Sequence, residues 1–391
     1  MDKKPLIVIS LCAVALLVLG SLGNVVGYQT PYAEKPLSTS QGNWLYVGGS
    51  GPGNYTRIQD AINDSHDTDT VFVYDDSSPY YESLIINTSI TLRGENRNTT
   101  IIDGTEVTLE TMIEVNGLRV TITELCIQHC QSNLTYSTVL MKNSHGERHR
   151  ITHNIFRDNT QNALTVIGTD SEISNNTFSN NSAALLLEYG GNHTVQDNIF
   201  INNKLSMLMY ECHWNTIQGN RILHSRGPLF MFLSNFNTFS ENILDQNTYG
   251  GIDSLGSCKN TFYHNMFSNN QYGIMLSASE GNSITENNFI NNSEYQATNI
   301  VHPFVGVGLS LYYHRQYARN GSFFALVGKN QWEANYWSDW DSSSPRPITR
   351  VIYFWSLRLL TRITGKVYPI HLSQYDWHPA QDPYDIGMFT T

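Results

Sequence analysis

The amino-acid sequence predicts an all-β solenoid, in which short strands of successive coils stack in parallel. The motif Asn-x-Phe-x-x-Asn recurs at an interval of 22 residues, first as "HNIFRDN" at 153–159 and then as "NNTFSNN" at 175–181. A fixed period of this length is typical of repeat architectures. Apolar residues alternate in short runs bounded by Asn, Ser and Gly, and do not follow the period of about 3.6 that a helix requires.

One asparagine column sets the register of seven coils. Successive members lie 22 residues apart, with one step of 23: Asn154, Asn176, Asn198, Asn220, Asn242, Asn265 and Asn287. An amide both donates and accepts hydrogen bonds, so stacked Asn side chains can form a ladder between coils. Asn also tolerates the left-handed backbone of a bend. We therefore predict a structural ladder, and the alternative is a row of Asn that binds a glycan or a metal.

A second column is aromatic and follows each marker Asn by two residues. Its aromatic members are Phe156, Phe178, Phe200, Phe267 and Phe289, and Ile222 and Leu244 occupy the two intervening coils. At a spacing of about 4.8 Å between coils, these rings are expected to form an internal stack. The column predicts where the core of the solenoid lies.

The two ends of the chain differ from the repeats. Residues 1–27 predict a signal peptide or N-terminal anchor, because Lys3 and Lys4 precede an apolar run over residues 5–22. We expect a linker over 28–43, an N-terminal cap with the first strands over 44–104, repeats over 105–298, and an aromatic-rich C-terminal cap or cover over 299–391. The pattern Thr56-Arg57-Ile58-Gln59 predicts a capping box and a short helix to about Asn63.

These repeats resemble a known family. The 22-residue coils, the segment 51–104 and the sequence "NYWSDWD" at 335–341 are similar to the NosD-like and carbohydrate-binding and sugar-hydrolysis (CASH) proteins. The resemblance implies a right-handed parallel β-helix of the pectin-lyase type with about eight or nine coils, on an archaeal surface protein. The NosD name carries a copper association, but no Cys/His/Met cluster supports it, so we expect no metal and no cofactor.

Net charge and the N-terminal segment limit which partners the protein can bind and where in or outside the cell we expect it. A formal net charge of −11 argues against binding a nucleic-acid backbone. We expect an exported protein, extracellular or on the cell surface, that contacts a membrane only through an uncleaved N-terminal segment at residues 5–22. Sequons of the type N-x-Ser/Thr would permit glycosylation at the bends. A surface polysaccharide or other glycan is the partner class that remains.

One outer face of the solenoid is expected to be apolar. The predicted outward positions in the strand after each Asn pair are Leu164, Leu186, Leu208, Phe230, Asp253 and Met275. An apolar stripe of this extent is rarely left open on a soluble monomer. We predict that the segment 299–377, and residues 351–360 above all, cover it.

Acidic residues on that face are the candidates for catalysis. Glu188 and Glu211 lie on neighbouring coils beside Tyr210, and Asp253 lies further along. A glycosidase needs two carboxylates that face each other across the scissile bond, and no column stacks acids on three consecutive coils. We therefore favour a structural or glycan-binding role without catalysis. The alternative is a polysaccharide-processing enzyme, which would be a lyase, glycoside hydrolase or epimerase.

Overall fold

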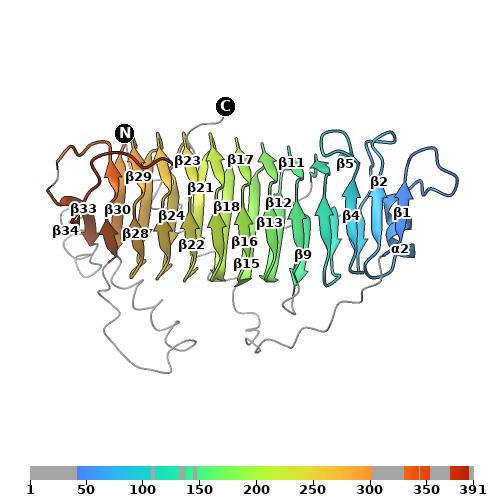
Figure 1. Ribbon diagram of the computed structural model, residues 1–391, viewed down its shortest axis with the longest axis horizontal. Coiled ribbons are helices and arrows are strands. Elements are labelled where there is room, and N and C mark those ends of the chain that lie inside the picture. The colour runs from blue at the N-terminus through green and yellow to red at the C-terminus, as the bar shows by residue number, and fades with distance from the viewer. Residues whose placement is uncertain are drawn as a thin grey trace, which may run out of the picture. The chain divides into compact units, whose positions relative to one another are not determined.

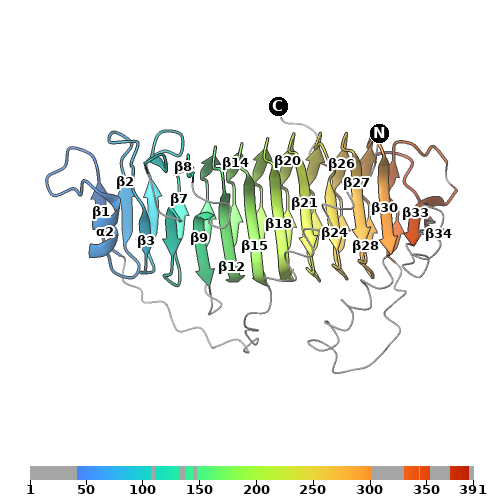
Figure 2. The ribbon, with the colours of Figure 1, turned by 180° about the vertical axis from the view of Figure 1, so that it is seen from behind.

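The structure is a computed structural model that describes residues 42–106, 111–131, 137–143, 148–301, 330–342, 344–352 and 370–386. They belong to one compact unit spanning residues 40–391. This unit is a right-handed parallel β-helix of about 11 turns, which confirms the predicted fold class. Its strands lie side by side from β1 to β33 (Figures 1 and 2).

Each regular coil contributes three strands, and each strand pairs in parallel with its counterpart in the next coil. The first column consists of β1 (Trp44–Val47), β2 (Thr70–Val73), β4 (Thr91–Gly94), β7 (Thr121–Thr123), β10 (Arg150–Thr152), β13 (Glu172–Ser174), β16 (Thr194–Gln196), β19 (Thr216–Gln218), β22 (Thr238–Ser240), β25 (Thr261–Tyr263), β28 (Ser283–Thr285) and β31 (Gln331–Glu333). The second consists of β5 (Ile101–Asp103), β8 (Cys126–Gln128), β11 (Ile155–Arg157), β14 (Thr177–Ser179), β17 (Ile199–Ile201), β20 (Arg221–Leu223), β23 (Ile243–Asp245), β26 (Met266–Ser268), β29 (Asn288–Ile290) and β32 (Tyr336–Trp337).

The third column holds the longer strands. It consists of β3 (Leu84–Ile86), β6 (Ile113–Val115), β9 (Ser137–Asn143), β12 (Asn162–Thr169), β15 (Ala183–Gly191), β18 (Leu205–His213), β21 (Gly227–Phe232), β24 (Ile252–Leu255), β27 (Tyr272–Ser277), β30 (Tyr295–Val301) and β33 (Arg346–Ile352). A last strand, β34 (Ile370–Asp376), pairs antiparallel with β33. One short helix, α2 (Ile58–Asp64), lies at the N-terminal end of the described coils.

The corners of the coils depend on residues with left-handed backbone. In one coil these are Asn175, Asn180 and Asn192, with φ values of 57°, 55° and 57°. Each precedes a buried residue that bonds to the next coil, here Asn176, Asn181 or His193. The prediction that the ladder Asn itself takes the left-handed conformation is therefore wrong, and the residue before it does so.

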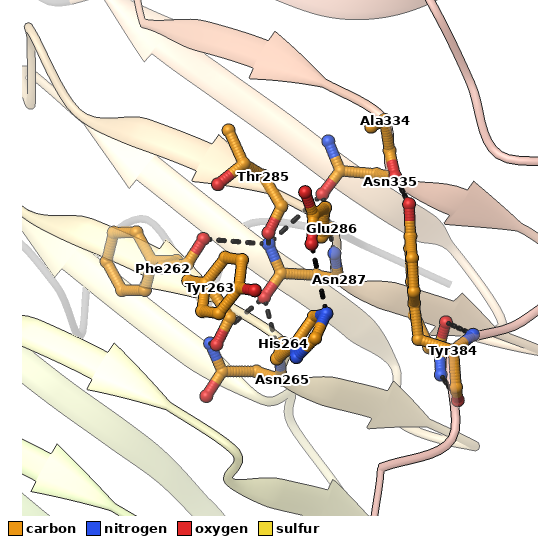
Figure 3. A network of polar contacts seen from close by, with 11 residues as sticks. Phe262, Tyr263, His264, Asn265, Thr285, Glu286, Asn287, Ala334, Asn335 and Tyr384 are labelled. Carbon is orange, nitrogen blue, oxygen red and sulfur yellow. Dashed lines mark hydrogen bonds and ion pairs between the residues drawn. The ribbon is translucent and has the colours of Figure 1, made fainter.

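The ladder bonds run in one direction along the solenoid. Asn265 donates to Asn287 Oδ1 from its backbone N at 2.8 Å and from Nδ2 at 3.0 Å, and Asn287 donates to Asn335 in the same way (Figure 3). Asn335 in turn donates both groups to Asp376 Oδ2, at 3.0 and 3.1 Å. A carboxylate can only accept, so Asp376 ends the ladder without needing a further coil.

Two further corners carry ladders of the same kind. The second includes Asn159, Asn181, Asn203, Asn247, Asn270 and Asn292, with Ser225 in one coil. The third was not identified in the sequence, and its amides are Asn215, Asn237, Asn260, Asn282 and Asn330. His193 occupies the third corner one coil earlier, where its Nδ1 accepts a hydrogen bond from Ser171 N.

The Phe column lies in the core as parallel rings. Phe178 stacks on Phe156 and on Phe200 with ring centroids 4.8 Å apart in both cases. Phe267 stacks on Phe289 at 5.0 Å, and Trp337 continues the column at 4.4 Å from Phe289. All of these rings are buried.

The estimate of eight or nine coils is too low. Strands β1 to β6 already form coils, although the sequence there lacks the Asn motif. At the other end β31 and β32 add a turn after residue 298, because Asn335 and Trp337 occupy the ladder and stack positions. An interruption between β30 and β31 hides this last repeat in the sequence.

The short helix is confirmed, but its cap is not the predicted capping box. Helix α2 begins at Ile58, and Arg57 makes no side-chain cap hydrogen bond. The carboxylate of Glu82 accepts from Ile58 N at 2.8 Å and from Gln59 N at 3.1 Å instead. A carboxylate at this end is favoured by the free N–H groups of the helix.

The strand phase is wrong by one residue in one coil. Leu164 pairs with Leu185 and points into the core, and Thr165 pairs with Leu186 on the outer face. A register shift between Ile167 and Thr169 restores the phase. In the described ranges no helix is long and apolar enough to cross a membrane, and the predicted anchor at residues 5–22 lies outside them.

Candidate functional site

Of the three predicted catalytic acids, two lie together and the third, Asp253, lies apart. Glu188 pairs in register with Tyr210, so Glu188 and Glu211 lie on adjacent coils beside Tyr189. Asp253 lies on β24, three coils from Glu188, which is roughly 14 Å at the spacing of parallel strands. Burial raises the pKa of Asp253 to about 7 and also raises the pKa of Glu188. A pair across one glycosidic bond would need a separation below about 10 Å, which excludes Glu188 with Asp253 but not Glu188 with Glu211.

The predicted apolar stripe is only partly shielded from solvent. Leu186 is 8% exposed, whereas Leu208, Phe230 and Met275 are half-buried. The segment predicted to cover this face falls mostly on 302–329 and 353–369, outside the described residues, so the cover stays a prediction.

A different part of the solenoid presents polar side chains, and we call it the polar edge. It is the corner between the second and third strand columns. One row has left-handed backbone, with φ between 50° and 56°: His129, Asp158, Asn180, Asn202, His224, Gln246, Asn269 and Asn291. A parallel row follows the second ladder: Thr160, Ser182, Lys204, Arg226, Thr248, Gln271 and Ser293. Left-handed corner residues project their side chains outward, so the edge is lined by functional groups rather than by backbone.

A shallow, open groove lies on the C-terminal half of the polar edge. It has a volume of about 830 Å³ and spans three consecutive coils. Its lining is composed of amides, hydroxyls and one carboxylate: Gln246, Asn247, Thr248, Asn269, Asn270, Gln271, Asn291, Ser293 and Glu294. We call it the amide groove. A surface with this lining is suited to a ligand rich in groups that both donate and accept hydrogen bonds.

Asp245 orients two of the exposed amides in the groove. Gln246 Nε2 donates to Asp245 Oδ2 at 2.9 Å, and Asn269 Nδ2 donates to Asp245 Oδ1 at 2.8 Å. Ser268 Oγ donates to the same carboxylate at 2.6 Å. Since their nitrogens are engaged, the two amides present their carbonyl oxygens as acceptors.

Other groups in the groove have hydrogen-bonding capacity to spare. Within the described parts of the chain, the side chains of Thr248, Gln271, Ser293 and Glu294 make no hydrogen bond. All but the half-buried Gln271 are exposed. Fixed acceptors beside unengaged donors are the usual composition of a polar binding site.

Aromatic side chains flank the amide groove. Arg226 lies over the ring of Tyr249 at 5.5 Å, and its Nη2 donates to the Tyr249 hydroxyl at 3.1 Å. Tyr295 follows Glu294 and is 47% exposed. Burial, together with Asp253 and Glu294, raises the pKa of Tyr272, so this hydroxyl stays protonated. Tyrosine combines an apolar ring with a hydroxyl and suits amphipathic ligands.

Unpaired cations continue along the same edge towards the N-terminus. Elsewhere Lys142 lies 3.0 Å from Glu114 and Arg346 lies 2.8 Å from Asp339. By contrast, Arg157, Lys204 and Arg226 have no carboxylate partner among the residues described. The same edge also carries Asp158, Asp245 and Glu294, so its charge is mixed.

A model of the "Right handed beta helix region" matches residues 52–226, 137–290 and 208–320. Together these segments cover more than half of the sequence. The chain belongs to the right-handed β-helix family. The finer resemblance to NosD-like and CASH proteins, and the archaeal origin, stay predictions. No sequence among curated proteins matches the chain.

Solved structures similar to this β-helix protein include several that act on carbohydrates. The PL6 family alginate lyase AlyGC is 13% identical with a TM-score of 0.45, over 66% of this chain and 51% of that one, so the chain spans about half its length. The PL6 family polysaccharide lyase Pedsa3628 from Pseudopedobacter saltans is 12% identical with a TM-score of 0.49, over 73% and 93%. A DFA-IIIase variant from Arthrobacter chlorophenolicus is 11% identical with a TM-score of 0.46, over 85% and 91%. Similarity at this level carries no inference about activity.

Sequence reasoning about this β-helix protein missed the polar edge for a specific reason. The repeating motif ends in a second Asn, but the two neighbours of that Asn were not followed along the coils. Those neighbours are polar in every repeat, and they are the residues that line the groove.

In the described part of the chain no three His, Cys, Asp or Glu side chains gather as a metal site.

Proposed function

We propose that this protein binds an extended glycan along the polar edge, with the amide groove as the principal contact. The observation that carries the proposal is a groove of about 830 Å³ lined by amides and hydroxyls on three consecutive coils. Sugar hydroxyls donate and accept hydrogen bonds, as do the amides of Asn and Gln, so each residue can serve a hydroxyl in either sense.

The geometry of the groove supports a chain-like ligand. Equivalent residues repeat at the coil spacing of about 4.8 Å, so successive units of a polymer would meet similar side chains. The flanking Tyr249 and Tyr295 supply apolar ring surface for the C–H faces of sugars. Many modest contacts of this kind give affinity through their number rather than through one deep pocket.

The location follows as part of the same proposal. A signal peptide or anchor over residues 1–27 would place the β-helix outside the cell, where polysaccharides are available. A NosD-like or CASH surface protein of archaeal origin would fit this role. The membrane is involved only if residues 5–22 stay attached.

Catalysis by Glu188, Glu211 and Asp253 is not part of the proposal, because Asp253 lies three coils from Glu188 and the adjacent pair Glu188 and Glu211 lies outside the amide groove. A polysaccharide-processing enzyme is the alternative function, and it would need another constellation of residues. That alternative becomes the better account if binding is accompanied by cleavage of the glycan.

A glycan-array screen followed by calorimetric titration tests the proposal. The variant Thr248→Ala/Gln271→Ala should weaken binding about 10-fold or more, because each lost hydrogen bond contributes about 1 kcal/mol. The matched control is Gln196→Ala, which removes a half-buried amide from the first strand column. Equal affinity of the double variant and the control, or an array without any ligand, would overturn the proposal.

A further inference from the structure

The last described residues of the chain lie across the outer face of the second strand column. After β34 the chain returns to the solenoid, where Ala380 N donates to Asn335 O at 3.0 Å. Tyr384 then lies against β29, and Ile386 packs on β23 and β26. We call residues 380–386 the tail segment. It crosses neighbouring coils instead of following a strand, so it is not another turn of the solenoid.

Asn288 holds the backbone of the tail segment. Its Nδ2 donates to Tyr384 O at 2.7 Å, and its Oδ1 accepts from Tyr384 N at 2.9 Å. Asn288 is fully buried, and it occupies the outward position that Ile243 and Met266 hold in the two preceding coils. One amide that bonds to both backbone groups of a residue can bind an extended peptide whatever side chain that residue carries.

Tyr384 is the first anchor of the tail segment. Its hydroxyl donates to Ala334 O at 2.8 Å, and its ring centroid lies 5.2 Å from that of His264 (Figure 3). His264 is itself fixed, because its Nε2 lies 3.0 Å from Glu286 Oε2 and its ring stacks on Tyr263 with centroids 4.1 Å apart. The solenoid therefore offers a tyrosine side chain both a ring surface and a hydrogen-bond acceptor.

Ile386 is the second anchor of the tail segment. It is 3% exposed and packs against Ile243 and Met266, in a cluster separate from the main core. By contrast, Ile199 holds the same outward position two coils before Ile243 and is 39% exposed. Asp385, between the two anchors, is exposed. Side chains that alternate in this way are those of an extended peptide with one face on a surface.

The connection that leads into the anchors suits an exchange between chains. Gln381, Asp382 and Pro383 are exposed, and they lead directly to the first anchor at Tyr384. Beyond this connection the described segment is held by its two anchors and by Asn288. Its detachment is therefore a local opening that leaves the ladders and the Phe stack in place. The same segment of a second copy would find identical contacts on this face.

We propose that this face is a peptide-binding site for the tail segment of a second copy of the chain, so that two copies exchange their tails in a dimer. The connection of three residues spans at most about 10 Å, so the two second-column faces must lie against each other. Reciprocal exchange fills both sites at once and closes the dimer. It would also cover Ile199, which is exposed in the single chain. This inference goes beyond glycan binding and does not depend on it.

A fluorescent peptide of residues 379–386 tests the site. The receptor is the full chain with Tyr384→Ala/Ile386→Ala, whose own tail lacks both anchors, and fluorescence anisotropy should show saturable binding. The wild-type chain should bind the peptide about 10-fold more weakly or less, because its own tail competes at a high effective concentration. A peptide with Asp385→Ala is the matched control and should bind as well as the original. Met266→Asp in the receptor should abolish binding, and circular dichroism checks that this variant folds.

Exchange between copies is measured on the full chain. Light scattering should show dimers of the wild type that increase with concentration, and Tyr384→Ala/Ile386→Ala should stay monomeric. An affinity-tagged wild-type chain should retain the untagged variant, because its tail enters the vacant site. A peptide that fails to bind the folded receptor would overturn the site. A wild type that stays monomeric at every concentration and retains no variant would overturn the exchange, even if the peptide binds.

Discussion

Two stretches of the polar edge share one backbone geometry but differ in chemistry. At the N-terminal stretch Asp103, Gln128 and Arg157 are linked to one another by hydrogen bonds of 2.6 Å, and His129 is held by the carboxylate. At the C-terminal stretch the groove side chains of Thr248 and Gln271 make no hydrogen bond within the described residues. A corner with φ near +55° recurs in both.

The difference shows that buried ladder residues stabilise each corner, while the outward side chains at the same corner determine what it can bind. The backbone at each corner is held by the ladder residue behind it, so the outward side chain is free to vary. Side chains that bond to one another, as Asp103, Gln128 and Arg157 do, produce a rigid cluster. Unsatisfied neutral side chains produce a surface that makes its hydrogen bonds with a ligand.

The largest effect on stability is expected from a substitution in the core, in a coil that lies between the two stretches. Phe178 lies on β14 between Phe156 and Phe200, with ring centroids 4.8 Å away on each side. Phe178→Ala should cost about 3–5 kcal/mol of unfolding free energy, because it leaves a cavity in a closely packed stack. Chemical unfolding measures it. A loss of unfolding free energy below about 1 kcal/mol would show that the Phe stack does not stabilise the coils between the two stretches.

A somewhat smaller effect is expected at the end of the ladder beyond the amide groove. Asp376 is fully buried and accepts from Asn335 N, Asn335 Nδ2 and Trp337 Nε1 at 3.0–3.1 Å. Asp376→Ala should cost about 3 kcal/mol, since buried donors lose their acceptor. Asp376→Asn keeps an acceptor oxygen and should cost about 1 kcal/mol.

The same pair of variants tells the two stretches apart. Hydrogen exchange of Asp376→Ala should accelerate first in the C-terminal coils next to β34, with the coils around His129 unaffected at first. Uniformly faster hydrogen exchange along the whole solenoid would mean that the two stretches unfold as one unit and do not differ in local stability.

A smaller effect on stability depends on pH and comes from His193, which lies in a coil between the two stretches. Burial lowers the pKa of His193 to about 4, and Nδ1 accepts from Ser171 N. The unfolded side chain titrates near 6.5, so the unfolded state binds the proton first. The stability that His193 contributes is complete above about pH 6.5 and falls as the pH drops towards 4. About 2 kcal/mol should be lost between pH 7 and pH 5.

The substitution His193→Asn isolates this group from other titrations. Asn supplies the acceptor found in the following coils and does not titrate, so the variant should lose less stability on acidification than the wild type. The control His224→Asn makes the same substitution at an exposed position and shows how much of the change comes from the substitution itself. Identical pH profiles for the wild type and His193→Asn would contradict the assignment.

Much of the fold could be predicted because its interactions recur at one interval. The positions of Asn154 to Asn287 and of the Phe rings follow from a period that the sequence displays directly. The interior of β12 could not be predicted, because a one-residue shift moves Leu164 inward and Thr165 outward without changing the spacing of the Asn markers. The last turn was missed because Asn335 and Trp337 follow a long interruption.

The candidate site was harder to predict for a different reason. Glu188, Glu211 and Asp253 were chosen as acids on one face, but convergence depends on how many coils separate them. The contact between Asp103 and His129 joins residues 26 apart, across an irregular coil where no motif marks the register. The amide groove is made of residue types that are common throughout this sequence, so composition gave no signal for it.

The most direct test of the account is the position of a bound oligosaccharide in a crystal structure of the protein with a glycan selected by array screening. The account predicts sugar rings along the three coils of the amide groove, with hydrogen bonds to Thr248, Gln271 and Ser293. Sugar bound instead at the exposed, stacked pair Trp214 and Phe236, whose ring centroids lie 5.4 Å apart on another corner, would contradict it.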